Sequence, residues 1–418
     1  MFTFLHAADI HLDSPLTGLS QHEEAPTETI RVATRTALTR LVDLAISKQV
    51  DFVLIAGDLY DGDWKDFGTG ISFNNEMRRL EAKQISVYLI YGNHDAASRV
   101  TKSLKLQPNV HVFPTKQPAT FQHATLPVSL HGQGFATQSV TENLAESYPE
   151  PKENHYNIGL LHTNLGDREG HGNYAPSSLP QLVSHGYDYW ALGHIHIREI
   201  HHEHPHVVYP GNTQGRHVKE TGAKGCYVVS VNDELETSSC EFFALDSVRW
   251  QNLPLDCSVL ESEDELLEAI RDQLSDSLRE ADGRLLAVRL TLTGNTQLHE
   301  LLHADHSRLR AECQSIALDI DAELIWIEDL RLKTRTLIDP EELAKQDDLT
   351  AFVLEALTAF DPNALPAPVE TLMKKLPSEA SRALQASLKP QGDAEREAMR
   401  DEISAIVLQA IATSDSAE

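Results

Sequence analysis

The segment VYLIYGNHDA at residues 87–96 joins a short apolar run to a turn that carries an amide, an imidazole and a carboxylate. The run Val87–Tyr91 has the length and composition of a buried strand. Gly92 permits a tight turn directly after it, and the next three residues are common both in turns and in metal or phosphate sites. On its own, this segment is as consistent with a purely structural turn as with a metal or phosphate site.

Apolar runs of the same kind recur along the first 245 residues, with helical patterns between them. We expect strands and two helices at the following positions: Phe2–Ala7, Phe52–Ala56, Val87–Tyr91, Ile158–Leu161, Tyr187–Leu192 and Val207–Tyr209 for strands, and Thr29–Lys48 and Ile71–Leu80 for helices. Alternation of buried strands with helices predicts an α/β layered domain over about 1–245, with a β-sheet core flanked by helices.

Five of these expected strands are followed by polar residues of a restricted kind. They are Asp9 and His11, then Asp58, then Asn93, His94 and Asp95, then His162, and finally His194 and His196. In open α/β sheets, ligands bind beyond the carboxyl ends of the strands. We therefore expect the five clusters to meet in one crevice.

The residue types in these clusters predict a metal site with two ions. Carboxylates, amide oxygens and imidazoles suit manganese, iron or zinc rather than soft copper. One carboxylate would bridge two ions held about 3.5–4 Å apart, the spacing used in two-metal phosphatases and nucleases. Each motif alone is weak evidence, but five in order, each after a strand, are not explained as a series of turns.

The order Asp-x-His, Gly-Asp, Gly-Asn-His-Asp, His and Gly-His-x-His, over about residues 1–215, resembles the calcineurin-like metallophosphoesterases. Four longer strings are similar to the YhaO-type DNA repair exonuclease family, which is related to SbcD-type nuclease subunits. They are HAADIHLDSPL (6–16), GDLYDGD (57–63), HTNLGDREGHGNYAP (162–176) and YPGNTQGRH (209–217). The resemblance implies a metallophosphoesterase fold and phosphoester hydrolysis.

The resemblance also assigns roles to individual residues. It implies that one ion is held by Asp9, His11, Asp58 and His196, and that Asp58 bridges to a second ion held by Asn93, His162 and His194. The two divalent ions are expected to be manganese, with iron or zinc as alternatives. His94 would act on the substrate as a catalytic residue, with Asp95 as its orienting partner, while a water activated by the metals attacks phosphorus.

One position departs from the pattern of SbcD-type nucleases. These commonly carry a histidine three residues after the Gly-Asp aspartate, where this chain has Asp61. The family associates that histidine with placing DNA for exonucleolytic cutting, so the mode and polarity of cleavage stay open. Asp61 and Asp63 are either acceptors that orient histidine ligands or solvated loop acids, and the sequence favours neither.

Two further sets of residues are weaker candidates for substrate contacts. They are Arg168, His171 and Tyr174, in a glycine-rich loop after a predicted ligand, and Arg216 and His217, which are either phosphate contacts or a surface pair.

Composition limits the class of protein. The chain of 418 residues has 35 Lys and Arg against 63 Asp and Glu, a formal net charge of −28. Most nucleic-acid-binding proteins show a basic footprint instead, so metal ions would have to supply the positive charge for a phosphate substrate. No apolar run approaches the ~20 residues of a membrane helix, and no signal peptide is expected. Four widely spaced cysteines exclude a CxxC zinc ribbon, and we expect a cytoplasmic protein without membrane contact.

The pattern changes after residue 245. Residues 246–338 are expected to form a small α+β module, with a capping box at Ser262–Glu265, a helix after it, a strand at 286–292, and a second helix–strand pair near Ser307–Ser315 and Leu324–Ile327. By analogy with SbcD-type relatives, this module would cap the phosphoesterase domain and help bind DNA. Residues 339–418 are expected to be helical, most clearly at Glu341–Phe360 and Asp393–Ala412. Their apolar stripes would pack either on the chain's own cap or on a partner protein, and the sequence favours neither.

Three functions of different classes remain. The first is metal-dependent hydrolysis of DNA phosphodiester bonds, as the exonuclease subunit of a repair complex that includes an SMC-type coiled-coil ATPase. The second is a phosphoesterase for small nucleotides or phosphoproteins, which the acidic composition favours. The third is a scaffold subunit, which the intact set of motifs disfavours. A homodimer is also compatible with the family.

Overall fold

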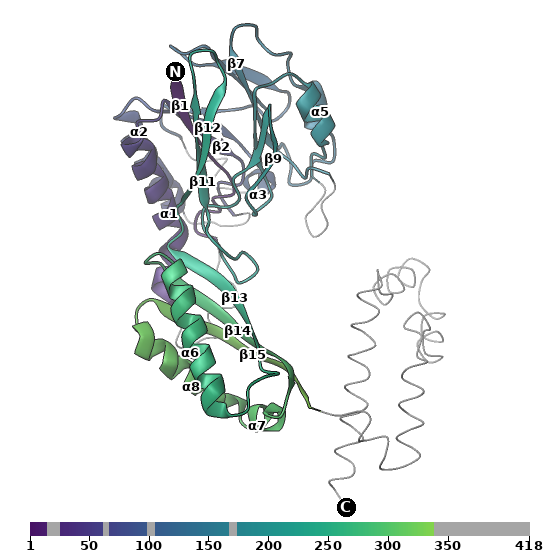
Figure 1. The fold of residues 1–418 in the computed structure, drawn as a ribbon. Coiled ribbons are helices and arrows are strands. Elements are labelled where there is room, and N and C mark those ends of the chain that lie inside the picture. The colour runs from purple at the N-terminus through teal and green to yellow at the C-terminus, as the bar shows by residue number, and fades with distance from the viewer. Residues whose placement is uncertain (15–25, 62–66, 98–104, 167–173, 338–418) are drawn as a thin grey trace, which may run out of the picture. The chain divides into compact units, whose positions relative to one another are not determined.

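The computed structural model describes residues 1–14, 26–61, 67–97, 105–166 and 174–337 (Figure 1). The chain divides into two compact units. The first contains Met1–Leu253, Gln273–Arg289 and Ala317–Asp329, and the second contains Pro254–Asp272, Leu290–Ile316 and the described residues from Leu330 onward. The predicted metal site lies wholly in the first unit.

One six-stranded sheet of the first unit has the order β12-β11-β1-β2-β3-β4. Its strands are β1 (Phe2–Ala7), β2 (Phe52–Ala56), β3 (Ser86–Ile90), β4 (Val110–Val112), β11 (Gly225–Val231) and β12 (Thr237–Ala244). The strands β1 to β4 run parallel, so the loops that follow β1, β2 and β3 emerge at the same edge. The strands β11 and β12 extend the sheet with antiparallel pairing.

A second six-stranded sheet has the order β5-β6-β7-β8-β10-β9. Its strands are β5 (Ala119–Gln122), β6 (Val128–Gly132), β7 (Tyr156–His162), β8 (Tyr189–Gly193), β9 (Glu199–Glu203) and β10 (His206–Tyr209). The four central strands are parallel, and β5 and β9 pair antiparallel at the two edges. The predicted ligands His162 and His194 therefore follow neighbouring parallel strands.

Three apolar cores arrange these elements in layers. Between the two sheets, aromatic side chains such as Phe4 and Phe52 stack with centroids 5.2 Å apart, and Tyr189 meets Phe4 edge-on at 5.1 Å. The helices α1 (Thr27–Ser47) and α2 (Phe67–Glu81) cover the outer face of the first sheet (Figure 1). The outer face of the second sheet is covered by α5 (Leu179–Ser184) and a 3₁₀ turn at Leu144–Ser147.

This architecture confirms the predicted α/β class, and it adds a second sheet that the sequence pattern did not separate from the first. All six predicted strands are present within two residues of their expected ends, as are the two predicted helices, apart from a longer N-terminus of α2. The missed strands β5, β9 and β12 have largely exposed or half-buried residues and therefore show no compact apolar run. The strands β6 and β11 were also missed, although they are largely buried.

The chain continues after residue 245 with a three-stranded sheet in the order β13-β14-β15. Its elements are β13 (Val248–Asp256), α6 (Glu263–Glu280), β14 (Leu285–Thr296), α7 (His299–Ala304), α8 (His306–Asp321) and β15 (Ile325–Thr336). Ser262 caps α6 as predicted, because its Oγ accepts a hydrogen bond from Glu265 N at 3.3 Å. The predicted helices Glu341–Phe360 and Asp393–Ala412 lie outside the described residues.

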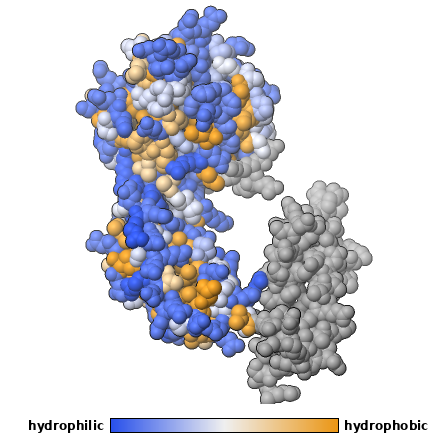
Figure 2. Space-filling view, viewed as in Figure 1, coloured by the Kyte–Doolittle hydropathy of each residue, from blue (hydrophilic) through white to orange (hydrophobic). Residues whose placement is uncertain are grey.

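Part of this later segment belongs to the first unit. Trp250 of β13 and Trp326 of β15 pack edge-on with ring centroids 6.0 Å apart. They share an apolar cluster with Ile30 and Ala33 of α1. The visible face in Figure 2 is mostly hydrophilic, with apolar residues in scattered groups. Among the described residues, no helix combines the length and apolar character needed to cross a membrane.

Candidate metal centre

The loops that carry the predicted ligands have an unusual backbone. Asp9, His11, Asp58 and His194 have φ values of 51°, 45°, 51° and 98°, in the left-handed region that residues with a side chain rarely adopt. Two backbone hydrogen bonds stabilise the first two loops against each other, from Asp9 N to Gly57 O and from His11 N to Asp58 O, both 3.0 Å. Strain of this kind is concentrated at functional sites, where the surrounding structure maintains it.

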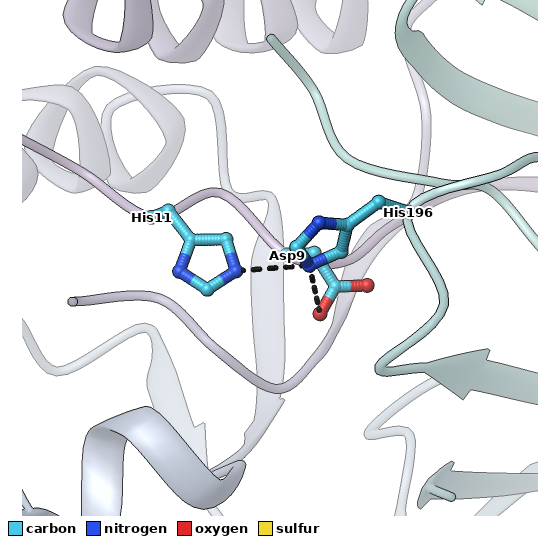
Figure 3. A group of neighbouring side chains, drawn as sticks. All are labelled: Asp9, His11 and His196. Atoms are coloured by element: carbon cyan, nitrogen blue, oxygen red, sulfur yellow. Dashed lines mark hydrogen bonds and ion pairs between the residues drawn. The ribbon is translucent and has the colours of Figure 1, made fainter. Parts of the chain in front are cut away.

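Asp9, His11 and His196 form the first group of converging side chains (Figure 3). Nε2 of His11 lies 3.2 Å from Nε2 of His196, and Oδ1 of Asp9 lies 4.0 Å from the same His196 nitrogen. Both Asp9 oxygens also accept the backbone N–H of His194, at 3.1 and 3.0 Å. The loops after β1 and β8 therefore present three ligand atoms to one point.

Asp58, His162 and Asn93 form the second group. Nε2 of His162 lies 3.4 Å from Asp58 Oδ2 and 3.1 Å from Asn93 Oδ1. The same Asp58 oxygen lies 3.9 Å from Nε2 of His11 in the first group. Asp58 is therefore placed between the two groups, as a bridging carboxylate would be. The His194 ring lies beside His162, with centroids 5.2 Å apart.

The donor set fits divalent metal ions. Nδ1 of His162 lies 3.0 Å from the Ala56 carbonyl oxygen and Nδ1 of His196 lies 2.7 Å from Glu220 Oε1, so both rings carry their proton on Nδ1 when neutral. Nε2 of each ring then carries a lone pair. At His162 this lone pair faces the Asp58 and Asn93 oxygens, and at His196 it faces Nε2 of His11. Several lone pairs aimed at one point are stable only around a cation or a proton.

The electrostatics of the buried groups agree with this. Burial alone would raise the pKa of Asp58, but the neighbouring imidazoles of His162, His11 and His94 outweigh it and lower that pKa below the usual range. Burial lowers the pKa of His162, and the charge of Asp58 more than reverses this, raising it to about 9. Burial raises the pKa of Asp9 to about 6. Asp58 is therefore an anion at neutral pH, available to a cation.

Glycines next to the ligands leave room for this arrangement. A Cβ atom added to Gly92 would lie 2.2 Å from Asp58 Oδ1 and 2.8 Å from His162 Cε1. A Cβ atom on Gly193 would lie 2.0 Å from the Ala56 carbonyl oxygen, which accepts the Nδ1 proton of His162. The residue type at both positions is thus determined by the ligands that lie beside it.

We therefore expect Gly92→Ala to lower the affinity for metal while the protein remains folded. The added methyl group must displace Asp58 or His162, and changes that misorient ligands typically reduce metal affinity by about 10–100-fold. Manganese titration followed by metal analysis measures the effect. Gly132→Ala is the matched control, since its Cβ would meet Phe113 at 3.0 Å within the core. Equal manganese affinity in Gly92→Ala and wild type would contradict the assignment.

His94 is paired with a different carboxylate from the one expected. Its Nδ1 lies 2.7 Å from Oδ1 of Asp61. Asp95, predicted as its orienting partner, instead accepts three backbone N–H groups, from Leu59 at 3.1 Å, Tyr60 at 2.9 Å and Gly92 at 3.0 Å. That prediction was wrong, because Asp95 lies in the first turn of the short helix α3 (Asn93–Ala97), where its carboxylate links the loops after β2 and β3.

Of the two interpretations left open for Asp61, the structure favours the orienting acceptor. Besides His94, Asp61 accepts a hydrogen bond from the Ser14 hydroxyl, and its Oδ1 lies 3.8 Å from Nδ1 of His11. Burial would raise the pKa of Asp61, but the bond to His94 and the nearby His11 lower it well below its usual value. Asp63 lies outside the described residues.

The structure places the weaker candidates for substrate contacts in different surroundings. Tyr174 lies beside the site, with its ring centroid 5.4 Å from that of His194. The Arg216 side chain is 17% exposed and pairs with Glu220 and Asp61, whereas the His217 side chain is 55% exposed. The two residues therefore do not form a surface pair. Arg168 and His171 lie outside the described residues.

Sequence reasoning missed Glu220, which is buried and contacts both His196 and Arg216. Residues 216–220 are not helical, so the four-residue spacing from Arg216 gave no signal, and the contacts of Glu220 form only in the folded chain.

Comparisons with known proteins agree with this geometry. Residues 2–198 match the calcineurin-like phosphoesterase family, and residues 250–335 match the middle domain of metallophosphoesterase YhaO. The uncharacterized metallophosphoesterase YhaO of Bacillus subtilis is 36% identical over 339 residues, which cover 80% of this chain and 82% of that protein.

More distant similarity extends to DNA double-strand break repair proteins Mre11. The protein from Sulfurisphaera tokodaii is 26% identical over 47% of this chain and 49% of its own length. That from Methanopyrus kandleri is 25% identical over 46% of this chain and 44% of its own. The family match and the 36% identity to YhaO over most of both chains decide the classification. This chain belongs to the calcineurin-like metallophosphoesterases and carries the middle domain of their YhaO-type members.

Proposed function

We propose that this chain hydrolyses phosphodiester bonds in DNA and acts as the exonuclease subunit of a repair complex. Membership of the family implies a metal-dependent hydrolase, and calcineurin-like phosphoesterases bind two divalent metal ions. The observation that carries the proposal is the position of Asp58 between two groups of ligand atoms, with the His94–Asp61 pair beside it. We propose manganese as the metal, with iron or zinc as alternatives.

Each residue then has a definite task. The ions, when bound, supply Lewis-acid chemistry and an activated water near neutral pH. Asp9, His11 and His196 would hold one of them, and Asn93, His162 and His194 the other, with Asp58 shared. Since Nδ1 of His94 is bound to Asp61, Nε2 is the nitrogen that would donate a proton to the leaving oxygen.

The DNA substrate is supported by relatives rather than by charge. The Mre11 proteins named above are DNA double-strand break repair proteins by name. The net charge of −28 favours the alternative, a phosphoesterase for small nucleotides or phosphoproteins. Two arginines of the later segment are also neutralised by acids: Arg289 pairs with Glu328 at 2.5 Å, and Arg308 pairs with Glu263 at 2.5 Å.

A cleavage assay separates the two substrate classes. Purified protein with added manganese is incubated with end-labelled linear DNA and, separately, with bis(p-nitrophenyl) phosphate. We expect manganese-dependent cleavage of both, and no cleavage of either by Asp58→Asn. Hydrolysis of the small diester with intact DNA would support the alternative substrate class and contradict the nuclease proposal.

The proposed partners rest on the family resemblance and on the apolar helical stripes expected in residues 339–418. A coiled-coil ATPase of the SMC type would dock on residues 339–418, which lie outside the described residues. A homodimer and a cytoplasmic location likewise stay predictions from the sequence.

A further inference from the structure

Glu220 lies at the end of the loop 210–220, which follows β10, and it holds a proposed metal ligand in place. Its carboxylate accepts a hydrogen bond from Nδ1 of His196 at 2.7 Å and another from the Asn212 amide at 2.9 Å. The first bond fixes the proton of His196 on Nδ1 and directs Nε2 toward His11. Glu220 therefore determines both the orientation and the tautomer of His196.

Arg216 of the same loop lies between two carboxylates that each hold a histidine of the site. Its Nη2 is 3.0 Å from Glu220 Oε1 and 3.3 Å from Nδ1 of His196, and its Nη1 is 3.5 Å from Asp61 Oδ2. Asp61 in turn binds Nδ1 of His94 at 2.7 Å. A continuous chain of polar contacts thus runs from His196 through Glu220, Arg216 and Asp61 to His94. It joins a proposed metal ligand to the histidine proposed to act on the substrate.

The loop 210–220 is hydrogen-bonded to the segment that contains β13. Nε1 of Trp250 donates to the Gly215 carbonyl oxygen at 2.9 Å. Nε2 of Gln214 donates to the Val248 carbonyl oxygen at 2.7 Å, and Gln214 Oε1 accepts the Ser247 N–H at 2.8 Å. All of these residues belong to the first unit. Hydrogen bonds buried in this way are specific in direction and costly to leave unmade.

Packing fixes the loop further. Val218 is part of the apolar cluster that contains Trp250 and Trp326. A Cβ atom on Gly215 would lie 2.6 Å from the Glu220 carbonyl oxygen and 3.0 Å from the Trp250 ring, so the loop passes close to both. The loop 210–220 is therefore held by β13 on one side and by the metal-site residues on the other.

We propose that Arg216 is a positioning residue that sets the relative placement of His196 and His94, and that the loop 210–220 transmits the position of β13 to both. The proposal rests on the phosphodiesterase function proposed above. It differs from direct phosphate binding by Arg216, because the guanidinium is only 17% exposed and its donors face Glu220 and Asp61. Arginine suits this position, since its planar fork can bind two carboxylates at once.

The test compares Arg216→Met with wild type, using the full chain loaded with manganese and bis(p-nitrophenyl) phosphate as substrate. We expect kcat to fall about 10–100-fold with KM within about twofold, as is typical when a supporting contact of a metal ligand is lost. Manganese bound at a limiting concentration should also fall, because His196 loses its fixed orientation. Arg216→Lys should give an intermediate kcat, since one charged donor remains.

Lys219→Gln is the matched control, because it removes one positive charge from an exposed position of the same loop and should leave kcat unchanged. A rise in KM at unchanged kcat in Arg216→Met would overturn the proposal in favour of a phosphate contact. A lower melting temperature with unchanged kcat and manganese binding would overturn it in favour of a structural role. If Arg216→Met does not fold, Arg216→Lys decides between the same outcomes.

Trp250→Phe tests the second half of the proposal. It removes the hydrogen bond to Gly215 and keeps an aromatic ring in the apolar cluster. We expect a fall in kcat of several-fold at unchanged KM, and an unchanged kcat would overturn the coupling to β13. These readouts use the small diester, so absence of DNA cleavage would refute the nuclease proposal without affecting them. Should the small diester also resist hydrolysis, manganese affinity still decides the role of Arg216.

Discussion

Asp58→Asn is expected to lose most of its bound metal and nearly all of its phosphodiesterase activity. Asp58 lies between the two groups, with Oδ2 3.4 Å from Nε2 of His162 and 3.9 Å from Nε2 of His11. The amide keeps the shape but removes the negative charge shared by both groups. Bound metal ions stabilise the transition state by several kcal/mol, and each factor of ten in rate corresponds to about 1.4 kcal/mol. We therefore expect the phosphodiesterase rate to fall on the order of 10³-fold or more.

Metal analysis and a kinetic assay on the same sample measure both losses. Asp51→Asn is the matched control, because Asp51 precedes β2, the strand that Asp58 follows, and accepts the Thr3 N–H at 2.8 Å at the opposite end of the sheet. It should retain metal and activity. If Asp58→Asn retained as much metal as this control, Asp58 would not be a ligand.

Most of the central strands were predictable from the sequence because they are buried on both faces, but β6 and β11, which are also largely buried, were not predicted. All residues of β2 and β7, for example, are buried, and most of them are apolar, which gives the short apolar runs Phe52–Ala56 and Ile158–Leu161. The edge strand β12 has no fully buried residue and gives no such signal. The division into two sheets was not predictable either, because it depends on which strands pair, and β8 pairs with β10 rather than with any strand of the first sheet.

The candidate metal ligands were predictable because the carboxyl ends of parallel strands meet at one edge, which brings residues as distant as His11 and His196 to 3.2 Å. Their supporting contacts were not. Asp61 and Glu220 lie in loops, and only the folded chain places Asp61 next to His94 and Glu220 next to His196. The choice of Asp95 failed for the same reason, because adjacency in sequence does not determine where a carboxylate in a helical turn points.

His94→Ala is expected to keep both metals and lose about 10²–10⁴-fold in kcat, the usual contribution of a positioned acid or base. His94 is 36% exposed and its Nδ1 is bound to Asp61, so its remaining nitrogen is available to a substrate. Burial would lower the pKa of His94, but the bond to Asp61 and the charge of Asp58 raise it, which favours the protonated form needed for proton donation.

Asp61→Asn should lower kcat by less than His94→Ala does, because it misorients His94 without removing it. The double variant should then be at most slightly slower than His94→Ala, since Asp61 would act mainly through His94 and only secondarily through Arg216. His155→Ala is the matched control, as His155 precedes β7 at the end opposite His162 and binds Ser129 Oγ at 3.1 Å. Additive losses in the double variant would show that Asp61 acts independently of His94. An unchanged kcat in His94→Ala would remove it from the mechanism, leaving the metals as the main source of catalysis.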